Sequence, residues 1–153
     1  MIGKKERRSL FIQSLKEGLK KGASTTWMLA RIILPIYFVV KILEYTKALT
    51  LISGLFEPIM QLFHLPGEAA LALVLGNGLN LYAGIGVMKA LTLDSHQITT
   101  LSLMLVFSHS LIMETAVVKR LNISASKIML MRVAMMLLTG LIYGGLIGRM
   151  AAA

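Results

Sequence analysis

The chain has 153 residues, of which 56% are hydrophobic and 15% are charged, and its mean hydropathy is +0.76. Soluble domains usually carry roughly a quarter charged residues, so this composition excludes a soluble globular fold and predicts an integral membrane protein. The sequence contains no cysteine, which excludes disulfides, thiolate chemistry and cysteine-ligated metals.

The net charge of +9 comes from Lys and Arg residues beside apolar segments, so we expect no nucleic-acid partner. Seven of the sixteen precede the first apolar span, which predicts a cytoplasmic N-terminus under the positive-inside rule. Phe11, Leu15 and Leu19 share one helical face of that stretch. We therefore predict a basic amphipathic segment on the anionic inner leaflet over residues 1–23, then a single membrane domain over residues 24–153.

The first span is predicted over residues 27–43, with Trp27 as an interfacial anchor and a kink at Pro35. Residues 50–64 contain an apolar run that is too short to cross and is interrupted by Gly54. This run predicts an interfacial helix lying along the membrane.

Residues 65–91 can be interpreted in two ways. They could form one long span, or a re-entrant hairpin (about residues 65–93) that turns at Gly76-Asn77-Gly78, because Gly and Asn favour turns. The hairpin places twelve Lys and Arg residues inside and four outside, whereas the single span gives ten and six. The positive-inside rule therefore favours the hairpin. Glu68 is interpreted as a carboxylate at the start of its first helix.

Two later segments, residues 98–118 and 128–147, each have the ~20 residues that a crossing requires. Arg31 and Arg132 lie a few residues inside their spans and are expected to snorkel toward the cytoplasmic headgroups. The last span carries small residues at a spacing that lets two helices approach closely, within the chain or between subunits: Gly140, Gly144 and Gly148.

Five polar residues interrupt the span over residues 98–118: Ser108, His109, Ser110, Glu114 and Thr115. The first three sweep around the helix, so no lipid-facing orientation hides all of them. Such groups cost several kcal/mol at membrane depth unless they are paired or hydrated. The span must therefore face protein or water, or be locally unwound, with freed carbonyls able to bind a cation or a hydroxyl. The alternative is that His109 and Glu114 merely hold helices together.

Asn77 and Asn80, near the predicted hairpin turn, are candidate ligand-binding residues, because hairpin tips expose helix ends and Asn both donates and accepts hydrogen bonds. In the structural alternative, Asn77 serves the turn and Asn80 caps the second helix. No motif for nucleotide binding, metalloprotease chemistry or a nucleophilic serine occurs, and the three histidines are scattered. We therefore expect no enzyme, no cofactor and no metal site.

The stretch "LPGEAALALVLGNGLNLYAGIGVMKAL" followed by "SHSLIMETAVVKR" resembles the bacterial nucleoside recognition, or Gate, domain family. That family includes spore maturation proteins A and B and a domain in the membrane part of ferrous iron transport protein B. The order of elements also resembles one of the two inverted repeats of concentrative nucleoside transporters. The likeness covers most of the chain after about Gly18.

The resemblance implies an all-α membrane fold with three transmembrane helices, an interfacial helix and a re-entrant hairpin, in a bacterial cytoplasmic membrane. It implies a transport subunit that moves or recognises a small polar solute, nucleoside-like or a cation; the alternative is a structural or regulatory subunit. One repeat supplies half of such a site, so we expect an oligomer. The glycine pattern of the last span favours a homo-oligomer, and the alternative is a sister subunit of opposite topology.

Overall fold

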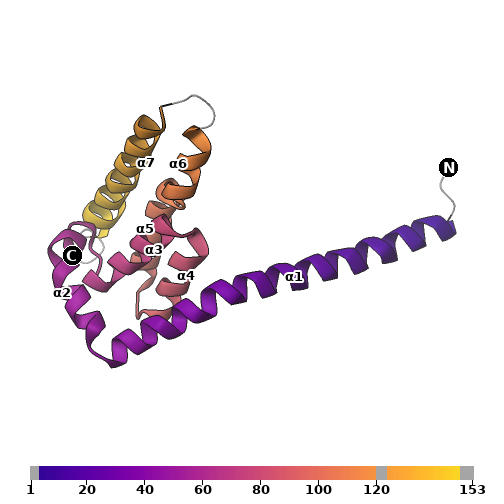
Figure 1. The fold of residues 1–153 in the computed structure, drawn as a ribbon, viewed down its shortest axis with the longest axis horizontal. Helices are drawn as coiled ribbons and strands as arrows, with labels where there is room; N and C mark the ends of the chain where they lie inside the picture. Colours follow the sequence, from indigo (N-terminus) through magenta and orange to yellow (C-terminus); the bar gives the residue numbers. More distant parts are fainter. Residues whose placement is uncertain (1–3, 120–123, 149–153) are drawn as a thin grey trace.

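The computed structural model describes residues 4–119 and 124–148, and its regular elements in these ranges are all helical (Figure 1). The expectation of an all-α fold is confirmed. The elements are, in chain order, α1 (Lys4–Tyr45), α2 (Ala48–Met60), η1 (Gln61–Phe63), η2 (Gly67–Ala69), α3 (Ala70–Gly78), α4 (Leu81–Ala90), α5 (Ser95–Ser108), α6 (Leu111–Lys119), α7 (Ala125–Thr139) and η3 (Gly140–Ile147), a π-helical continuation of α7.

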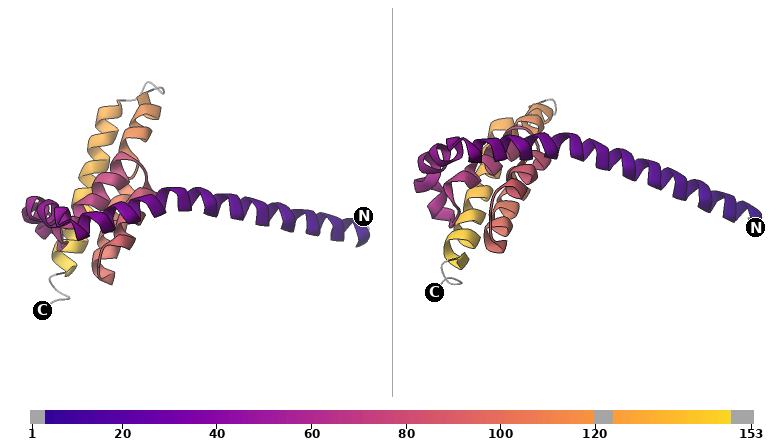
Figure 2. Two further views of the ribbon diagram at one scale, coloured as in Figure 1. Left: turned by 60° about the horizontal axis from the view of Figure 1, so that its bottom comes forward. Right: turned by 90° about the horizontal axis from the view of Figure 1, so that it is seen from below.

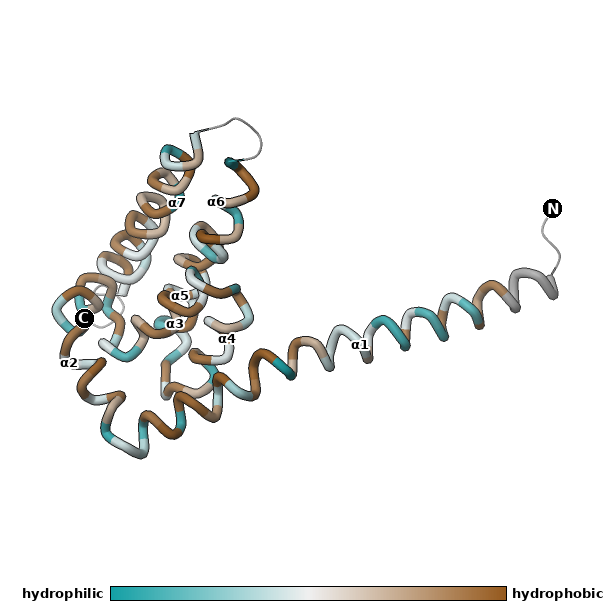
Figure 3. Tube along the Cα trace, in the orientation of Figure 1, coloured by the Kyte–Doolittle hydropathy of each residue, from teal (hydrophilic) through white to brown (hydrophobic). Residues whose placement is uncertain are grey.

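Three helical stretches are long and apolar enough to cross a membrane: Leu10–Tyr45, Ser95–Lys119 and Ala125–Ile147. These stretches are mainly apolar, with polar interruptions in α6, whereas polar and apolar residues alternate in the N-terminal half of α1 (Figure 3). The predicted number of spans is therefore confirmed. A fourth candidate is the pair Ala48–Phe63 and Gly67–Gly78, which passes the same test together but is bent by 89°.

α1 is one continuous helix of 42 residues, so no break separates the predicted amphipathic segment from the first span. At ~1.5 Å per residue it is about twice as long as the ~30 Å membrane core. Its residues from Leu10 to Met28 are exposed and project away from the remaining helices (Figure 2). Pro35 does not interrupt it: α4 supports this turn, where Gly86 lies close to Ile36.

The 89° bend between α2 and α3 is held by two carboxylates. Glu57 Oε2 accepts a hydrogen bond from the Gly67 backbone N–H at 2.9 Å, and Glu68 Oε2 accepts one from Ser53 Oγ at 2.7 Å. Gly67 approaches the backbone of Ser53 so closely that a side chain would not fit there. Glu68 lies in the first turn of η2, as expected, but Glu57 is the carboxylate that accepts a backbone N–H at this helix start.

α3 and α4 form a helical hairpin, so residues 65–91 are not one long span. Nine and ten residues give helices of only ~15 Å, and neither can cross alone. The turn is not at the predicted Gly76-Asn77-Gly78: these residues stay helical, and the chain reverses at Leu79 and Asn80. Gly76 instead permits close packing, since a Cβ there would lie 2.6 Å from Leu105 Cδ2.

The glycines of the last span pack within the chain. A Cβ at Gly140 would lie 2.7 Å from Phe63 Cδ1, and one at Gly144 would collide with the Phe63 carbonyl. Gly148 faces the His96 ring of α5 in the same way. η3 thus packs on η1 and α5, and the surface that we expected to favour a homo-oligomer is already occupied. The close contact is intramolecular because η1 lies directly against these glycines.

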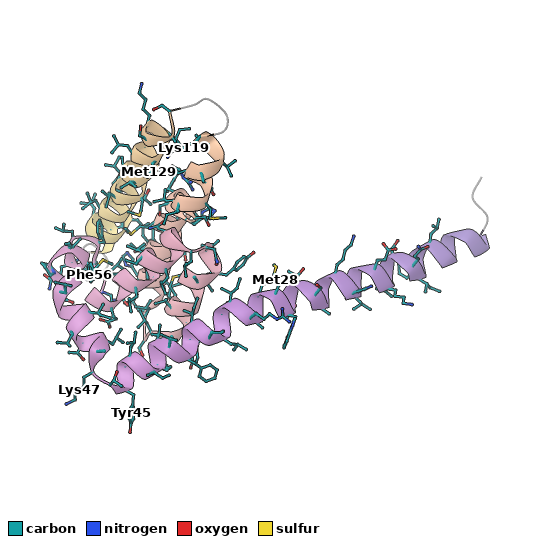
Figure 4. The ribbon with its side chains drawn as sticks, viewed as in Figure 1. Met28, Tyr45, Lys47, Phe56, Lys119 and Met129 are labelled. Atoms are coloured by element: carbon teal, nitrogen blue, oxygen red, sulfur yellow. The ribbon has the colours of Figure 1, made fainter. Side chains whose placement is uncertain are left out.

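The ends of the helices form two groups. Tyr45 and Lys47, at the turn between α1 and α2, lie at the end opposite Lys119 (Figure 4). The loop that precedes α5 lies at the Tyr45 end (Figure 1). Arg120 and Arg149, which entered the charge count, lie outside the described residues. The arrangement agrees with a hairpin that enters and leaves from one side, but the membrane orientation stays a prediction.

We predict that Ser95→Cys and Gly54→Cys react with a membrane-impermeant thiol reagent from outside the cell, and Ser126→Cys only from the cytoplasm. The assignment follows from the excess of Lys and Arg at the N-terminus and near residues 119–127. Single cysteines report cleanly because the native chain has none. Reaction of position 95 only from the cytoplasmic side would contradict the hairpin topology.

We predict that Gly144→Ala lowers the free energy of unfolding by about 1–3 kcal/mol, because the new methyl overpacks the contact with Phe63. Gly54→Ala is the matched control: no atom of the described part of the chain lies within 4 Å of its Cβ position, and the better helix propensity of Ala should add about 0.5–1 kcal/mol. Denaturation in detergent micelles measures both. Equal effects would show that η3 does not pack on η1.

Candidate functional site

The third span is broken in its middle. α5 ends at Ser108, α6 begins at Leu111, and Ser110 has a left-handed backbone with φ of 56°. The polar side chains before the break bond to their own helix: Ser108 Oγ donates to the Met104 carbonyl at 3.0 Å, and His109 Nδ1 lies 3.0 Å from the Leu105 carbonyl. The local unwinding that the sequence allowed as one explanation is therefore present.

The hairpin docks on this break. The backbone N–H of Ser110 donates to the carbonyl of Gly76, in the last turn of α3, at 3.0 Å. Ser110 could not reach that carbonyl from a continuous helix, because its N–H would bond within the helix. The end of α3 and the interrupted span therefore share a backbone hydrogen bond.

Arg132 of α7 satisfies the carbonyls that the break frees. Its Nε donates to the Phe107 carbonyl at 2.8 Å and its Nη2 to the His109 carbonyl at 3.1 Å, while Nη1 pairs with the carboxylate of Glu114. The expectation that Arg132 snorkels to the headgroups is wrong: its side chain is only 16% exposed and points at the neighbouring span. Arg31, by contrast, is exposed, and its guanidinium lies 5.3 Å from the centre of the Trp27 ring.

Glu114 lies between two groups. Its Oε2 meets Arg132, and its Oε1 lies 3.7 Å from His109 Nε2. A carbonyl oxygen only accepts, so His109 Nδ1 must carry the proton that it donates to Leu105. Nε2 therefore faces the carboxylate without that proton. The side chains of Glu114 and His109 are 46% and 34% exposed in the single chain, so this face is open.

The other predicted residues do not join this cluster. Asn80 caps α4, its Oδ1 accepting the Ala83 N–H at 3.0 Å, which is the structural alternative. Asn77 Nδ2 lies 3.7 Å from Met136 Sδ, while its Oδ1 is buried and has no hydrogen-bond partner among residues 4–119 and 124–148. Thr115 donates to the Leu111 carbonyl within its own helix. The cluster therefore comprises His109, Ser110 and Glu114, with the Gly76 carbonyl of the hairpin.

The role of Arg132 at the break was not among the predictions made from the sequence. The spans that contain Glu114 and Arg132 are joined by a short polar loop, and the two residues are equally distant from residue 123 in that loop. Adjacent antiparallel helices place such positions at the same depth. Opposite charges at one depth in a membrane pair with each other, and this signal was present in the sequence.

The site offers two backbone carbonyls, further hydrogen-bonding groups and one carboxylate. Within residues 4–119 and 124–148, no three His, Cys, Asp or Glu side chains come together as metal ligands. Two cavities with polar linings lie elsewhere, beside α2. One of about 410 Å³ is lined by Glu57 and His64, and one of about 250 Å³ by Ser53 and Glu68.

We predict that Glu114→Gln and Arg132→Met are strongly non-additive. Removing one partner of a buried ion pair costs about 3–5 kcal/mol. Because Glu114 is half-exposed, we expect ~1–3 kcal/mol for Arg132→Met, partly recovered in the double variant. The free energies of unfolding of the native protein, the two single variants and the double variant, measured in micelles, give the coupling energy. A coupling energy near zero would mean that the pair does not hold these helices.

Two similarities place the chain among known proteins. The uncharacterized membrane protein YvoD of Bacillus subtilis (strain 168) is 41% identical to this chain over 118 residues. The match covers 77% of this chain but only 38% of YvoD. No solved structure matches significantly. The family model for Gate, described as nucleoside recognition, matches residues 26–153, so the chain belongs to the Gate family of membrane proteins.

Proposed function

We propose that the chain is a membrane transport subunit that binds a small polar solute at the break between α5 and α6. The observation that carries this proposal is the half-exposed pair His109 and Glu114, set beside an unwound backbone and the end of a helical hairpin. Transporters place substrate sites at such discontinuous helices, where backbone polar groups and helix ends are available for a ligand. The Gate family assignment itself indicates a transport-related role.

A nucleoside-like solute fits the chemistry of this face. Its sugar hydroxyls can donate hydrogen bonds to the carboxylate of Glu114, which lies on the open face. The family description, nucleoside recognition, supports the same class. A small cation is the other solute class that carbonyl and carboxylate oxygens accept. Neither class requires a cofactor or a catalytic residue.

A structural or regulatory role is the second candidate, and one observation favours it. Arg132 already fills the hydrogen-bonding capacity of the break, since it contacts two freed carbonyls and Glu114. A subunit that only holds helices together needs nothing more. In that case, ligands will not change its stability.

A ligand screen separates these candidates. The purified protein in nanodiscs is heated in the presence of nucleosides, nucleobases or metal ions, and also at a range of pH values. The melting temperature is recorded in each case. A ligand that binds only the native state raises the melting temperature by mass action. We expect a nucleoside to do so, whereas no response to any compound would support the structural role.

We predict that Glu114→Gln and His109→Ala abolish or strongly reduce uptake of the ligand found in that screen by proteoliposomes, while both variants remain folded and inserted. The physical reason is that each removes a polar group from the open face of the break. Glu44→Gln is the matched control, since that carboxylate pairs with Lys41 far from the break. Unchanged uptake in both site variants would show that the proposed site is wrong.

We propose further that the chain works beside a second Gate unit, either another copy or a sister subunit of opposite topology, in a bacterial cytoplasmic membrane with its N-terminus inside. Half-exposed Glu114 and His109 are costly against lipid, so another protein surface or water must cover them. The part of YvoD that the match leaves uncovered is longer than this chain, which gives room for a second unit there.

We predict that the chain expressed alone forms a homo-oligomer in nanodiscs, because self-association would cover this polar face. Native mass spectrometry measures the mass, and Glu114→Gln should weaken the assembly. A stable monomer would contradict self-association and leave the sister subunit as the partner. An antiparallel dimer would contradict the topology inferred from the charges.

A further inference from the structure

Three oxygen atoms around the break converge on one positive charge. They are the carbonyl oxygens of Phe107 and His109 and a carboxylate oxygen of Glu114, and all three face the guanidinium of Arg132. Backbone carbonyls with a carboxylate are the donor set that hard metal cations prefer. Unwound helices in transporters offer such sets to coupling ions. The break therefore has the ligands of a cation site, and a side chain of the chain itself fills it.

We infer that Arg132 is a tethered cation, which holds the position that a free monovalent metal ion would otherwise take. The inference rests on the proposed function in taking the break as the functional centre. Glu114 contributes one negative charge and Arg132 one positive charge, so the site is neutral when Arg132 is in place. A metal ion added to it would meet a fixed positive charge in a poorly screened environment.

The geometry requires arginine. Its planar guanidinium presents several N–H donors in fixed directions, and the three nitrogens contact three different acceptors. The low exposure of the side chain, 16%, shows that it fills the space between α6 and α7. A lysine would keep the charge but would reach fewer of these oxygens. Stability and any uptake by the native protein should consequently be independent of sodium and potassium.

The test is the melting temperature in sodium chloride or potassium chloride, compared with choline chloride at equal ionic strength. The native protein should show no difference between the salts. Arg132→Met removes the guanidinium that these three oxygens face, so its melting temperature should fall in choline and recover by several degrees in one of the metal salts. Arg132→Met combined with Glu114→Gln lacks the negative charge and should not respond.

Two results would overturn the inference: equal stabilisation of the native protein and Arg132→Met by a metal ion, or no response of Arg132→Met to either metal ion. Should Arg132→Met not fold in choline, Arg132→Ala is tested with millimolar guanidinium against millimolar urea. Stabilisation by guanidinium alone supports a cation position, and no stabilisation rejects it. Because the readout is stability and not uptake, the inference can fail or hold whatever uptake by Glu114→Gln and His109→Ala shows about the function.

Discussion

The structure depends on the contacts that Arg132 makes across the broken span. A helix that unwinds within a membrane frees carbonyls that have no water to bond to, and each such group costs several kcal/mol. Arg132 supplies the donors for Phe107 and His109, and the charge that balances Glu114. With these contacts, α5 can end at Ser108 and α6 can begin at Leu111 without an uncompensated charge. The cost of the break is thus offset by α7, which the short loop brings alongside α6.

The break also determines how the hairpin and the open face are arranged. The Ser110 N–H, released from its helix, bonds to the carbonyl of Gly76, so the end of α3 is fixed against the third span. The same change of direction leaves one side of Glu114 and His109 uncovered. The break thus has a well-bonded inner side, where Arg132 contacts it, and a polar, half-exposed outer side. The acidic cavities beside α2 belong to a separate bend, held by Glu57 and Glu68.

Much of this fold could be predicted from the sequence. Span length and hydropathy predicted the three crossing segments, and the run of Ser108, His109 and Ser110 indicated that the third span could not be a simple lipid-facing helix.

The prediction of a turn at Gly76-Asn77-Gly78 was wrong, because composition does not distinguish glycines that turn a chain from glycines that let helices touch. Arg132 was missed because its depth was counted from the nearer membrane surface alone. Glu114 and Arg132 lie equally far along the chain from the connecting loop, and this is visible only when the two spans are considered as a pair. The partner of the glycines in the last span, η1, is far away in the sequence and could not be read from spacing.

The most direct test of the central claim is hydrogen–deuterium exchange over residues 105–112 in nanodiscs, for the native protein and for Arg132→Met. We expect slow exchange of the His109 and Ser110 amides in the native protein, since they donate to the Leu105 and Gly76 carbonyls. Loss of Arg132 should open the break and speed this exchange by roughly tenfold or more, while amides in α4 remain as protected as before. Equal exchange over residues 105–112 in both proteins would contradict the claim that Arg132 holds the broken span together.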